Sequence, residues 1–277
     1  VTKDDVNAMK SKVNTWVLRL IAFTIFSVCS ANSMADKFVI GAQRLDYFPH
    51  YDFTSSRDRG VAWAILEAFS KYSGHELVYL SLPVKRLQIE LQKGNIDFVF
   101  PDNPRWDNGI QATQKKVFSE PLVHTLTGSF LTEEKRGHTI SSIKTLAVPK
   151  GFTPVKWKQR INSNLVKVIE VDDVYEGLQL VNQGKADAID LEYHVVDYFV
   201  KRYPQLAGIE LDITLPYKDV PFQLSTVNQP EVIAQLNQFL IEHASEVSQI
   251  VKSYQIKQPD ALVKQLTLGI NETANNQ

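Results

Sequence analysis

The sequence predicts an α/β protein with two similarly built lobes. Strand-like and helix-like patterns alternate along most of the chain, and a β-rich segment at 123–132 is long enough to cross between lobes. A unit of helix, Gly-x-x-Asp turn and strand occurs twice, with its turn at Gly94 and Asp97 and again at Gly184 and Asp187. Because a third copy is missing, the repeat favours two lobes over a solenoid, although such units are common in α/β proteins.

The composition is that of an ordinary globular protein. The chain has 277 residues, of which 44% are hydrophobic and 22% charged, so one large or two small domains can bury a sizeable core. The net charge of −1 provides no basic face, and we therefore exclude nucleic acid as a partner.

Residues 1–35 have the features of a secretory signal peptide. Basic residues precede the short apolar run 20–28, and Ser33-Met34-Ala35 offers a small-x-small cleavage site. We expect an upstream extension at 1–8, cleavage after Ala35 and export to the periplasm. Cys29, the only cysteine, lies in this segment, so disulfides and thiol chemistry are excluded from the mature chain.

The patterns predict the elements of the first lobe in order. A strand at 37–42 enters an aromatic loop at 43–51, whose rings either clamp a ligand or plug the lobe. A helix at 60–72 closes at Gly74, a strand follows at 76–82, and Pro83 opens a second helix that ends at Gly94. The next strand ends at Phe100.

A polar loop at 101–106 follows this strand and is the first candidate for a binding wall. Ligands of open α/β sheets lie outside the carboxyl ends of strands, where connecting loops converge. The loop contributes Asp102 and Arg105. Arg86 lies in the first turn of the preceding helix, where a cation opposes the helix dipole; its partner is either a ligand or a structural acid.

The second lobe repeats the alternation. We expect strands at 143–148, 164–171, 186–189 and 209–215, and helices at 173–183 and 195–203. The residues around 216–227 return towards the first lobe. We expect helices at 229–254, with a break near 244–247, and at 260–266. Residues 271–277 are expected to be disordered.

Two helix starts have capping signals. Asp173 and Glu176 form a capping box. Thr153 as N-cap with Pro154 as the first helical residue predicts a second start, whose free N–H groups form either an anion site or a bare cap.

Spacing indicates no catalytic triad, no His-x-x-x-His pair and no phosphate-binding glycine loop. We therefore expect His50, His124 and His194 to be scattered structural or surface residues, and we predict neither a metal nor a cofactor.

Five motifs follow one another in a distinctive order: Tyr47-x-Pro49, the helix with Gly94-x-x-Asp97, Phe118-Ser119-Glu120-Pro121-Leu122, Gly151-x-Thr153, and Gly184-x-x-Asp187-Ala188 followed by Glu192. Taken together, they resemble the motifs of family 3 extracytoplasmic solute-binding proteins, which include the polar amino acid receptors of ABC importers and have FS-x-P-Y in place of the third motif. The resemblance covers 37–256. Each motif is weak alone, but their order and spacing are fairly specific.

The resemblance implies an α/β fold of the type II periplasmic-binding-protein kind, in which two lobes joined by a two-stranded hinge close on a ligand. Lobe 1 would comprise 36–126 and lobe 2 would comprise 127–217. Residues 218–277 would return to lobe 1 and add the C-terminal helices.

The resemblance also implies roles for single residues. Tyr47 would stack on the ligand, and Gly151, Phe152 and Thr153 would bind its carboxylate through backbone N–H groups. Glu192 would pair with its amino group.

Other positions depart from the family pattern. The loop that should carry the carboxylate-binding arginine is shorter and offers only Arg105, while Arg44 replaces an amine-binding acid and Val84 a stacking aromatic. An extra cation near the cleft, whether Arg44, Arg86 or Arg105, favours a more anionic ligand than an α-amino acid, because arginine suits carboxylate.

We therefore expect a monomeric receptor that captures a small polar or charged solute, an amino acid or related carboxylate, for an ABC-type importer or a membrane sensor. The alternative is a dehydratase-like periplasmic enzyme on the same fold, with Glu192 as its acid or base.

Overall fold

The computed structural model describes residues 36–106 and 115–275, so the predicted signal peptide at 1–35 lies outside the described residues. Within the described part of the chain, no helix is both long enough and apolar enough to cross a membrane. Strands and helices alternate from Lys37 onward, as the sequence predicts.

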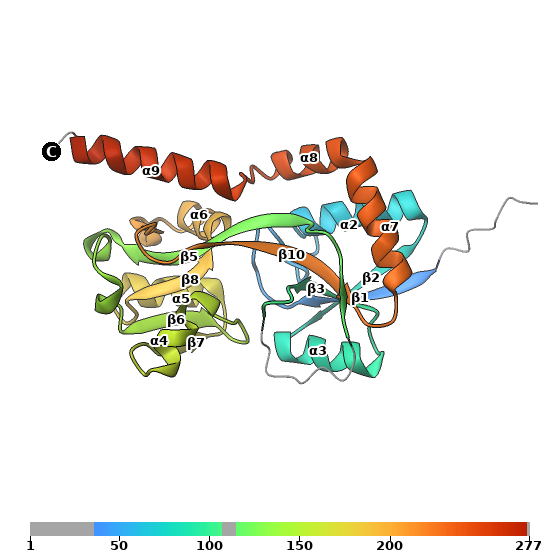
Figure 1. Ribbon diagram of the computed structural model, residues 1–277, viewed down its shortest axis with the longest axis horizontal. Coiled ribbons are helices and arrows are strands. Elements are labelled where there is room, and N and C mark those ends of the chain that lie inside the picture. The colour runs from blue at the N-terminus through green and yellow to red at the C-terminus, as the bar shows by residue number, and fades with distance from the viewer. Residues whose placement is uncertain (1–35, 107–114, 276–277) are drawn as a thin grey trace, which may run out of the picture. The chain divides into compact units, whose positions relative to one another are not determined.

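One half of a mixed β-sheet, with its helices, forms lobe 1 (Figure 1). Its strand order is β2-β1-β3-β10, in which the first three strands are parallel and β10 is antiparallel. Helices α2 and α7 lie on one side of this half and α3 on the other. The elements are β1 (Lys37–Gln43), α2 (Val61–Ser73), β2 (Glu76–Leu82), α3 (Val84–Lys93), β3 (Phe98–Asp102), β4 (Val117–Phe118), β10 (Lys218–Thr226), α7 (Pro230–Glu242) and α8 (Ala244–Ser253).

The other half of the sheet forms lobe 2 and has the same construction. Its strand order is β5-β8-β6-β7, with β6 parallel to both neighbours and β5 antiparallel to β8. The elements are β6 (Thr145–Pro149), α4 (Lys158–Asn162), β7 (Lys167–Val171), α5 (Val174–Asn182), β8 (Ala188–Glu192), α6 (Tyr193–Arg202) and β9 (Ile209–Leu211), with 3-10 turns η1 (Glu133–Lys135), η2 (Ile140–Ser142), η3 (Val155–Trp157) and η4 (Pro204–Leu206).

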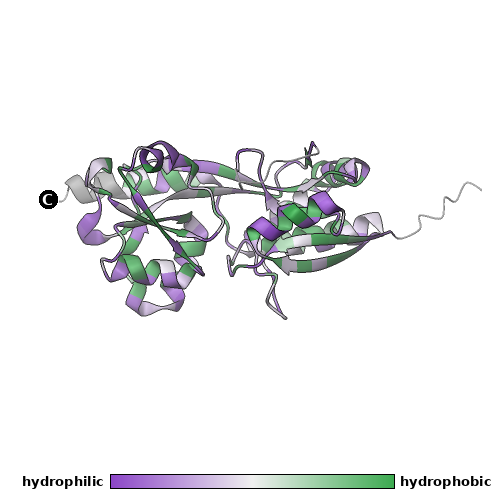
Figure 2. Cartoon of the chain, turned by 90° about the horizontal axis from the view of Figure 1, so that it is seen from below, coloured by the Kyte–Doolittle hydropathy of each residue, from purple (hydrophilic) through white to green (hydrophobic). Residues whose placement is uncertain are grey.

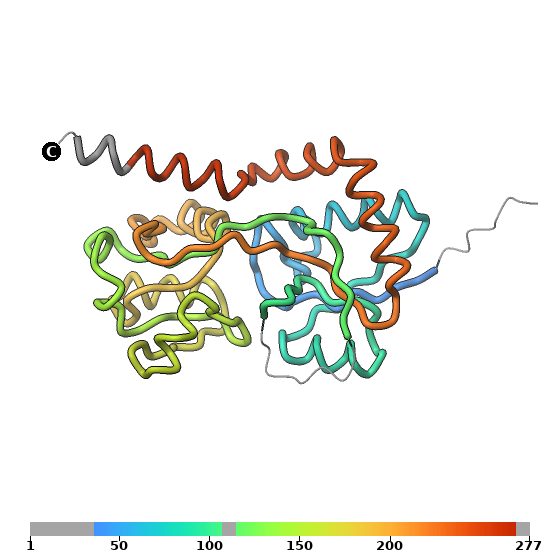
Figure 3. Tube along the Cα trace, in the orientation of Figure 1, coloured from blue at the N-terminus to red at the C-terminus, as the bar shows by residue number. Residues whose placement is uncertain are grey.

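Two long antiparallel strands connect the lobes, and Figure 3 shows them running side by side. β5 (Val123–Thr132) has the predicted bounds and passes from lobe 1 to lobe 2. β10 returns beside it, with Phe222 opposite Val123 and Lys218 opposite Thr127. This pair forms the expected two-stranded hinge.

The repeated Gly-x-x-Asp unit has the same structural role in both lobes. Gly94 and Gly184 follow their helices with φ of 73° and 68°, a left-handed conformation that glycine adopts without steric cost. Asp97 then accepts a hydrogen bond from the N–H of Val39 in β1, and Asp187 accepts one from the N–H of Thr145 in β6. In each lobe the aspartate therefore ties the strand after the helix to its parallel neighbour.

The central strands β3 and β8 are buried at every residue, because helices cover both faces of each half-sheet. Figure 2 shows hydrophobic residues concentrated along the strands of both halves. Phe98, Phe100, Ile189 and Leu191 are each fully buried. Both strands end in acidic residues, so their carboxylates sit at the edge of an apolar core.

The segment after β6 differs from the prediction. Thr153 and Pro154 do not begin a helix; η3 begins at Val155 without a side-chain cap, and α4 has only five residues. Pro154 has ψ of 71°, outside the helical region, so a regular helix cannot start there. The predicted capped helix start at Thr153 is therefore wrong.

The C-terminal helices also differ in extent. The expected break falls at His243, between α7 and α8. α9 (Pro259–Asn275) continues well beyond 266, so the prediction of disorder is wrong for 271–275. The helix also packs against the hinge strand β5, and its Leu262 is 1% exposed.

Candidate functional site

A cavity of about 80 Å³ lies between the lobes, where loops follow the carboxyl ends of β1, β3 and β6 and β8 contributes a carboxylate. At roughly 10–15 Å³ per water position, it has room for about five to eight waters, which suits a small metabolite better than a peptide. The lining residues are Gln43, Tyr47, Tyr51, Val84, Leu87, Gln88, Pro101, Asp102, Arg105 and Trp106 from lobe 1, Thr127, Lys218, Val220 and Phe222 from the hinge, and Val148, Asp190 and 151–156 from lobe 2.

The aromatic loop after β1 supplies one wall. Tyr47 and Tyr51 pair through a β-bridge and stack with ring centroids 5.2 Å apart. The hydroxyl of Tyr51 donates to Gln43 at 2.5 Å. Burial raises the pKa of both tyrosines well above the ordinary value, so both hydroxyls stay protonated. The loop therefore presents neutral aromatic surface to the cavity.

Asp102 lines the cavity but is already bonded within lobe 1. Its carboxylate lies 2.5 Å from Lys116 Nζ, and it accepts further hydrogen bonds from Ser225 Oγ at 2.6 Å and from the N–H of Asn103 at 2.8 Å. Asp102 is 1% exposed, so these contacts compensate for the loss of water around the charge.

The two predicted lobe-1 arginines have different positions. Arg105 lines the cavity and donates to two neutral oxygens, Oδ1 of Asn103 at 3.3 Å and the carbonyl of Asp219 at 3.2 Å. Arg86 is not among the cavity-lining residues; its Nε lies 2.8 Å from Glu90 on the same helix. Of the alternatives left open for Arg86, the structural acid is the one observed.

The loop after β6 closes the cavity from lobe 2. Gly151, Phe152 and Thr153 all line it, as expected of ligand-binding residues. Gly151 has φ of 84°, and a Cβ on it would lie 2.9 Å from Cβ of Val84 in lobe 1. Phe152 packs against Tyr47 with ring centroids 5.6 Å apart. The lobes are therefore in direct contact at the rim of the cavity.

Sequence reasoning missed the ion pair of lobe 2. Lys156 Nζ lies 2.7 Å from Oδ1 of Asp190, and the side chains are 8% and 6% exposed. Burial raises the pKa of Asp190, and the attraction of Lys156 offsets this only in part. Asp190 lies in the middle of the buried strand β8, two residues before Glu192 and therefore on the same face. Because side chains two positions apart on a strand share a face, the sequence could have placed Asp190 beside Glu192.

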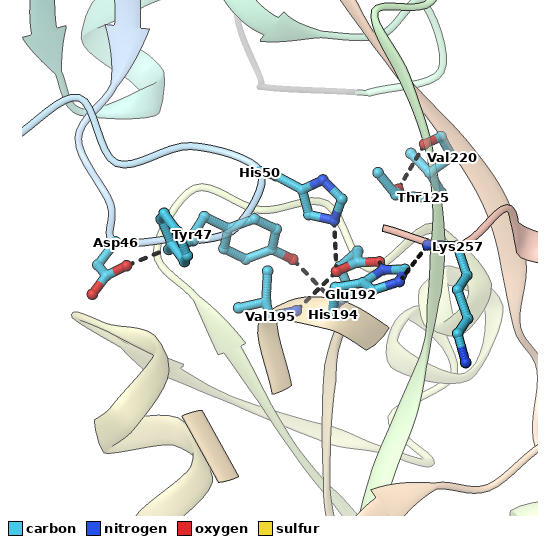
Figure 4. A network of polar contacts seen from close by, with 10 residues as sticks. Asp46, Tyr47, His50, Thr125, Glu192, His194, Val195, Val220 and Lys257 are labelled. Atoms are coloured by element: carbon cyan, nitrogen blue, oxygen red, sulfur yellow. Dashed lines mark hydrogen bonds and ion pairs between the residues drawn. The ribbon is translucent and has the colours of Figure 1, made fainter. Parts of the chain in front are cut away.

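Glu192 does not line the cavity; it lies behind it in a polar cluster drawn from three segments (Figure 4). Oε2 of Glu192 lies 2.8 Å from Nε2 of His50 in lobe 1 and accepts from the N–H of Val195, while Oε1 accepts from Nδ1 of His194 at 3.0 Å. The N–H of Glu192 donates to the hydroxyl of Tyr47 at 3.2 Å.

The ionised form of this carboxylate is stabilised despite its complete burial. Burial alone would raise the pKa of Glu192, but the charge of His50 and hydrogen bonds from both histidines outweigh it and lower the pKa to about 2. The expectation that His50 and His194 are scattered is thus wrong, because the fold brings both onto one carboxylate.

Hydrogen bonding determines the tautomer of His194. A backbone N–H can only donate, so Nε2 of His194 accepts from the N–H of Lys257 at 2.9 Å, and the proton of the neutral ring is on Nδ1. His50, Glu192 and His194 have the donor types of a metal site and lie within 4.8 Å of one another. A metal on Nδ1 of His194 would, however, move the proton to Nε2, against Lys257 N–H. The cluster therefore fits a hydrogen-bonded carboxylate rather than a metal centre.

No family model matches the sequence, and no curated protein matches it. Solved structures do match. The periplasmic VFT2 domain of BvgS from Bordetella pertussis is 21% identical, with a TM-score of 0.61 over 79% of this chain and 93% of that chain. An ancestral arginine-binding protein bound to arginine is 18% identical, with a TM-score of 0.64 over 80% and 99%. The ancestral amino acid-binding protein AncCDT-1, a precursor of cyclohexadienyl dehydratase, is 16% identical, with a TM-score of 0.61 over 79% and 95%.

At these identities the likeness establishes the fold. The chain has the two-lobed α/β fold of type II periplasmic binding proteins, which amino acid receptors of ABC transporters share with the BvgS domain. The resemblance to family 3 amino-acid-binding proteins, drawn from motifs, is confirmed as a structural match.

Proposed function

We propose that this protein is a periplasmic solute-binding receptor that encloses a small polar or charged solute, an amino acid or related carboxylate, between its lobes. The observation that carries this proposal is the cavity itself: both lobes line it, and they meet at its rim through Gly151 against Val84 and Phe152 against Tyr47. A cavity shared by two lobes widens when the lobes separate, which is how a two-lobed receptor captures and releases a ligand.

The partner that receives the bound solute is an ABC-type importer or a membrane sensor, and the receptor acts as a monomer. Both partner classes use this fold, since the matching structures include a substrate-binding protein of an amino acid ABC transporter and a BvgS domain. Release into the periplasm follows cleavage after Ala35. Export is tested by sequencing the N-terminus of protein recovered by osmotic shock.

Solute binding is tested by a thermal-shift screen of amino acids and carboxylates, followed by solution scattering. A ligand at 100 times its Kd adds about 2.7 kcal/mol to the free energy of unfolding. The ligand should also reduce the radius of gyration of a population that includes open molecules, without a change of oligomeric state. Absence of stabilisation by every compound in the screen would count against a receptor for this solute class.

Catalysis through Glu192 is not supported by its position. The carboxylate is fully buried, does not line the cavity and has both oxygens engaged by the chain. An acid or base must reach the proton it transfers within hydrogen-bond distance.

A further inference from the structure

The carboxylates around the cavity are already matched to cations of the protein. Asp102 is paired with Lys116, and Asp190 with Lys156. Both aspartates are nine-tenths buried or more, so separating either from its lysine to bind a ligand would leave a lysine charge uncompensated in a poorly solvated site. Among the cavity-lining residues that the structure describes, no other side chain is a carboxylate.

Glu192 cannot take their place without breaking the lobe contact. Its two oxygens are engaged by His50, His194 and the N–H of Val195, and the side chain is 0% exposed. Because Glu192 does not line the cavity, a ligand ammonium could reach its carboxylate only by displacing His50.

Positive charge, in contrast, is available. The lining has three cations, Arg105, Lys156 and Lys218, against two carboxylates, Asp102 and Asp190. Among the described residues, the side chain of Arg105 donates to two neutral oxygens and forms no ion pair, using Nε and one Nη. A guanidinium has five N–H donors, so Arg105 retains donors and its full charge for a ligand carboxylate.

The rest of the wall is aromatic and aliphatic. Tyr47, Trp106, Phe152 and Phe222 line the cavity, and the hydroxyl of Tyr47 is used in the bond from Glu192. This surface suits an uncharged carbon skeleton.

We infer that the ligand is a small carboxylate without an ammonium group, held through Arg105, rather than an α-amino acid. This inference rests on the proposed receptor function and names its ligand class. An ammonium entering the cavity loses hydration and finds no unpaired carboxylate among the described lining residues, whereas a carboxylate meets Arg105, which has no acidic partner among them.

Matched ligand pairs test this, because each pair differs only in the ammonium group. We would measure binding by calorimetry for succinate and L-aspartate, glutarate and L-glutamate, 4-methylpentanoate and L-leucine, and 3-phenylpropionate and L-phenylalanine. In any pair that binds, the acid without the ammonium should bind about ten- to a hundred-fold more tightly, which corresponds to one charge-assisted interaction.

Variants identify the groups responsible. Arg105→Gln should weaken the carboxylate by about ten- to a hundred-fold. Arg86→Gln is the matched control, because Arg86 pairs with Glu90 outside the cavity, and it should leave affinity unchanged. Lys156→Met should release Asp190 and favour the amino acid of the pair. The double variant Lys156→Met/Asp190→Asn removes both charges, so it should fold and show no such gain.

The outcomes separate the two proposals. Equal or tighter binding of the amino acid by the wild-type protein would overturn the ligand class and leave the receptor function standing. Equal weakening by Arg105→Gln and Arg86→Gln would overturn the role of Arg105. If no member of any pair binds, both the ligand class and the receptor function fail.

Discussion

The carboxylate of Glu192 is held by His50 from lobe 1 and by His194 and Val195 N–H from lobe 2, entirely out of contact with water. Because Nε2 of His194 accepts from the N–H of Lys257, that ring is neutral in this arrangement, and Nε2 of His50 lies 2.8 Å from the other carboxylate oxygen. The pair joins the two lobes directly.

Breaking this pair should be costly. We expect His50→Gln to lower the free energy of unfolding by about 1–3 kcal/mol, because it removes the imidazole beside one oxygen of a fully buried carboxylate. The double variant His50→Gln/Glu192→Gln should lose less than the sum of the single losses, as measured by urea denaturation. His124→Gln is the control: that histidine pairs with Asp219 at an exposed site, so about 0–1 kcal/mol is expected. Additive losses at His50 and Glu192 would contradict the pairing.

The same carboxylate should make stability depend on pH. The pKa of Glu192 is about 2 in the folded protein and 4.5 without the fold, so its contribution is fully present above pH 4.5 and is lost as pH falls towards 2. The pKa of Asp187, which is lowered from 3.8 to about 2 in the folded protein, makes stability depend on pH in the same direction. The melting temperature should therefore fall over this range. Glu192→Gln should flatten the fall, and an unchanged slope would show that Glu192 is not ionised.

For single residues, the sequence predicted which side chains lie near the ends of strands, but it did not predict which side chains they pair with. Asp102 ends a buried strand, and Arg105 and Gly151 follow buried strands, which is why local patterns place them at the cavity. Whether they bind ligand stays a prediction. The pairing of Glu192 with His50 and of Asp190 with Lys156 depends on segments far apart in the chain, and spacing carries no information about it.

Among the elements, the loop after β6 is the part of lobe 2 that touches lobe 1. Gly151→Ala should lower ligand affinity and shift the molecule towards an open form, because its Cβ would lie 2.9 Å from Cβ of Val84 and also strain a positive φ. Gly184→Ala is the matched control: φ is 68°, but nothing lies within 4 Å of the new Cβ.

Comparing the two variants separates the effect of backbone strain at a positive φ from the effect of the steric clash with Val84. Both should lose about 1–2 kcal/mol of stability through left-handed strain, while only Gly151→Ala should weaken binding and enlarge the radius of gyration. Equal effects on binding would show that the contact with Val84 is unimportant.

Regular elements with strong local signals were predicted well. Glycines in the left-handed conformation end α2 and α3, and the N–H of Glu176 donates to Asp173 at the start of α5. The prediction failed at Thr153, where Pro154 leaves the helical region, and at 271–275, which continue α9.

For the whole molecule, the two-lobed plan followed from the repeated unit and the long strand at 123–132, since both are visible as local patterns. The third connection between the lobes was not visible. After α7 and α8 pack on α2 of lobe 1, the chain crosses to lobe 2, where Lys257 bonds to His194.

Spin labels can test whether α9 moves with lobe 2. Cys29 is the only cysteine of the sequence, so in protein that starts at Asp36 the paired substitutions Leu268→Cys/Leu80→Cys and Leu268→Cys/Leu165→Cys label only these exposed sites. The solute that stabilises the protein most should change the distance from 268 to 80 in lobe 1 and leave that from 268 to 165 in lobe 2 unchanged. The reverse pattern would assign α9 to lobe 1.

The hydrogen bond between Lys257 and His194 connects the start of α9 to lobe 2, so α9 would turn with that lobe. The helix starts two residues after that bond and has 17 residues, so it is about 25 Å long. Each degree by which lobe 2 turns against lobe 1 would then move the far end of the helix by about 0.4 Å relative to lobe 1. A turn of about 5° would therefore displace the far end of α9 by about 2 Å relative to lobe 1.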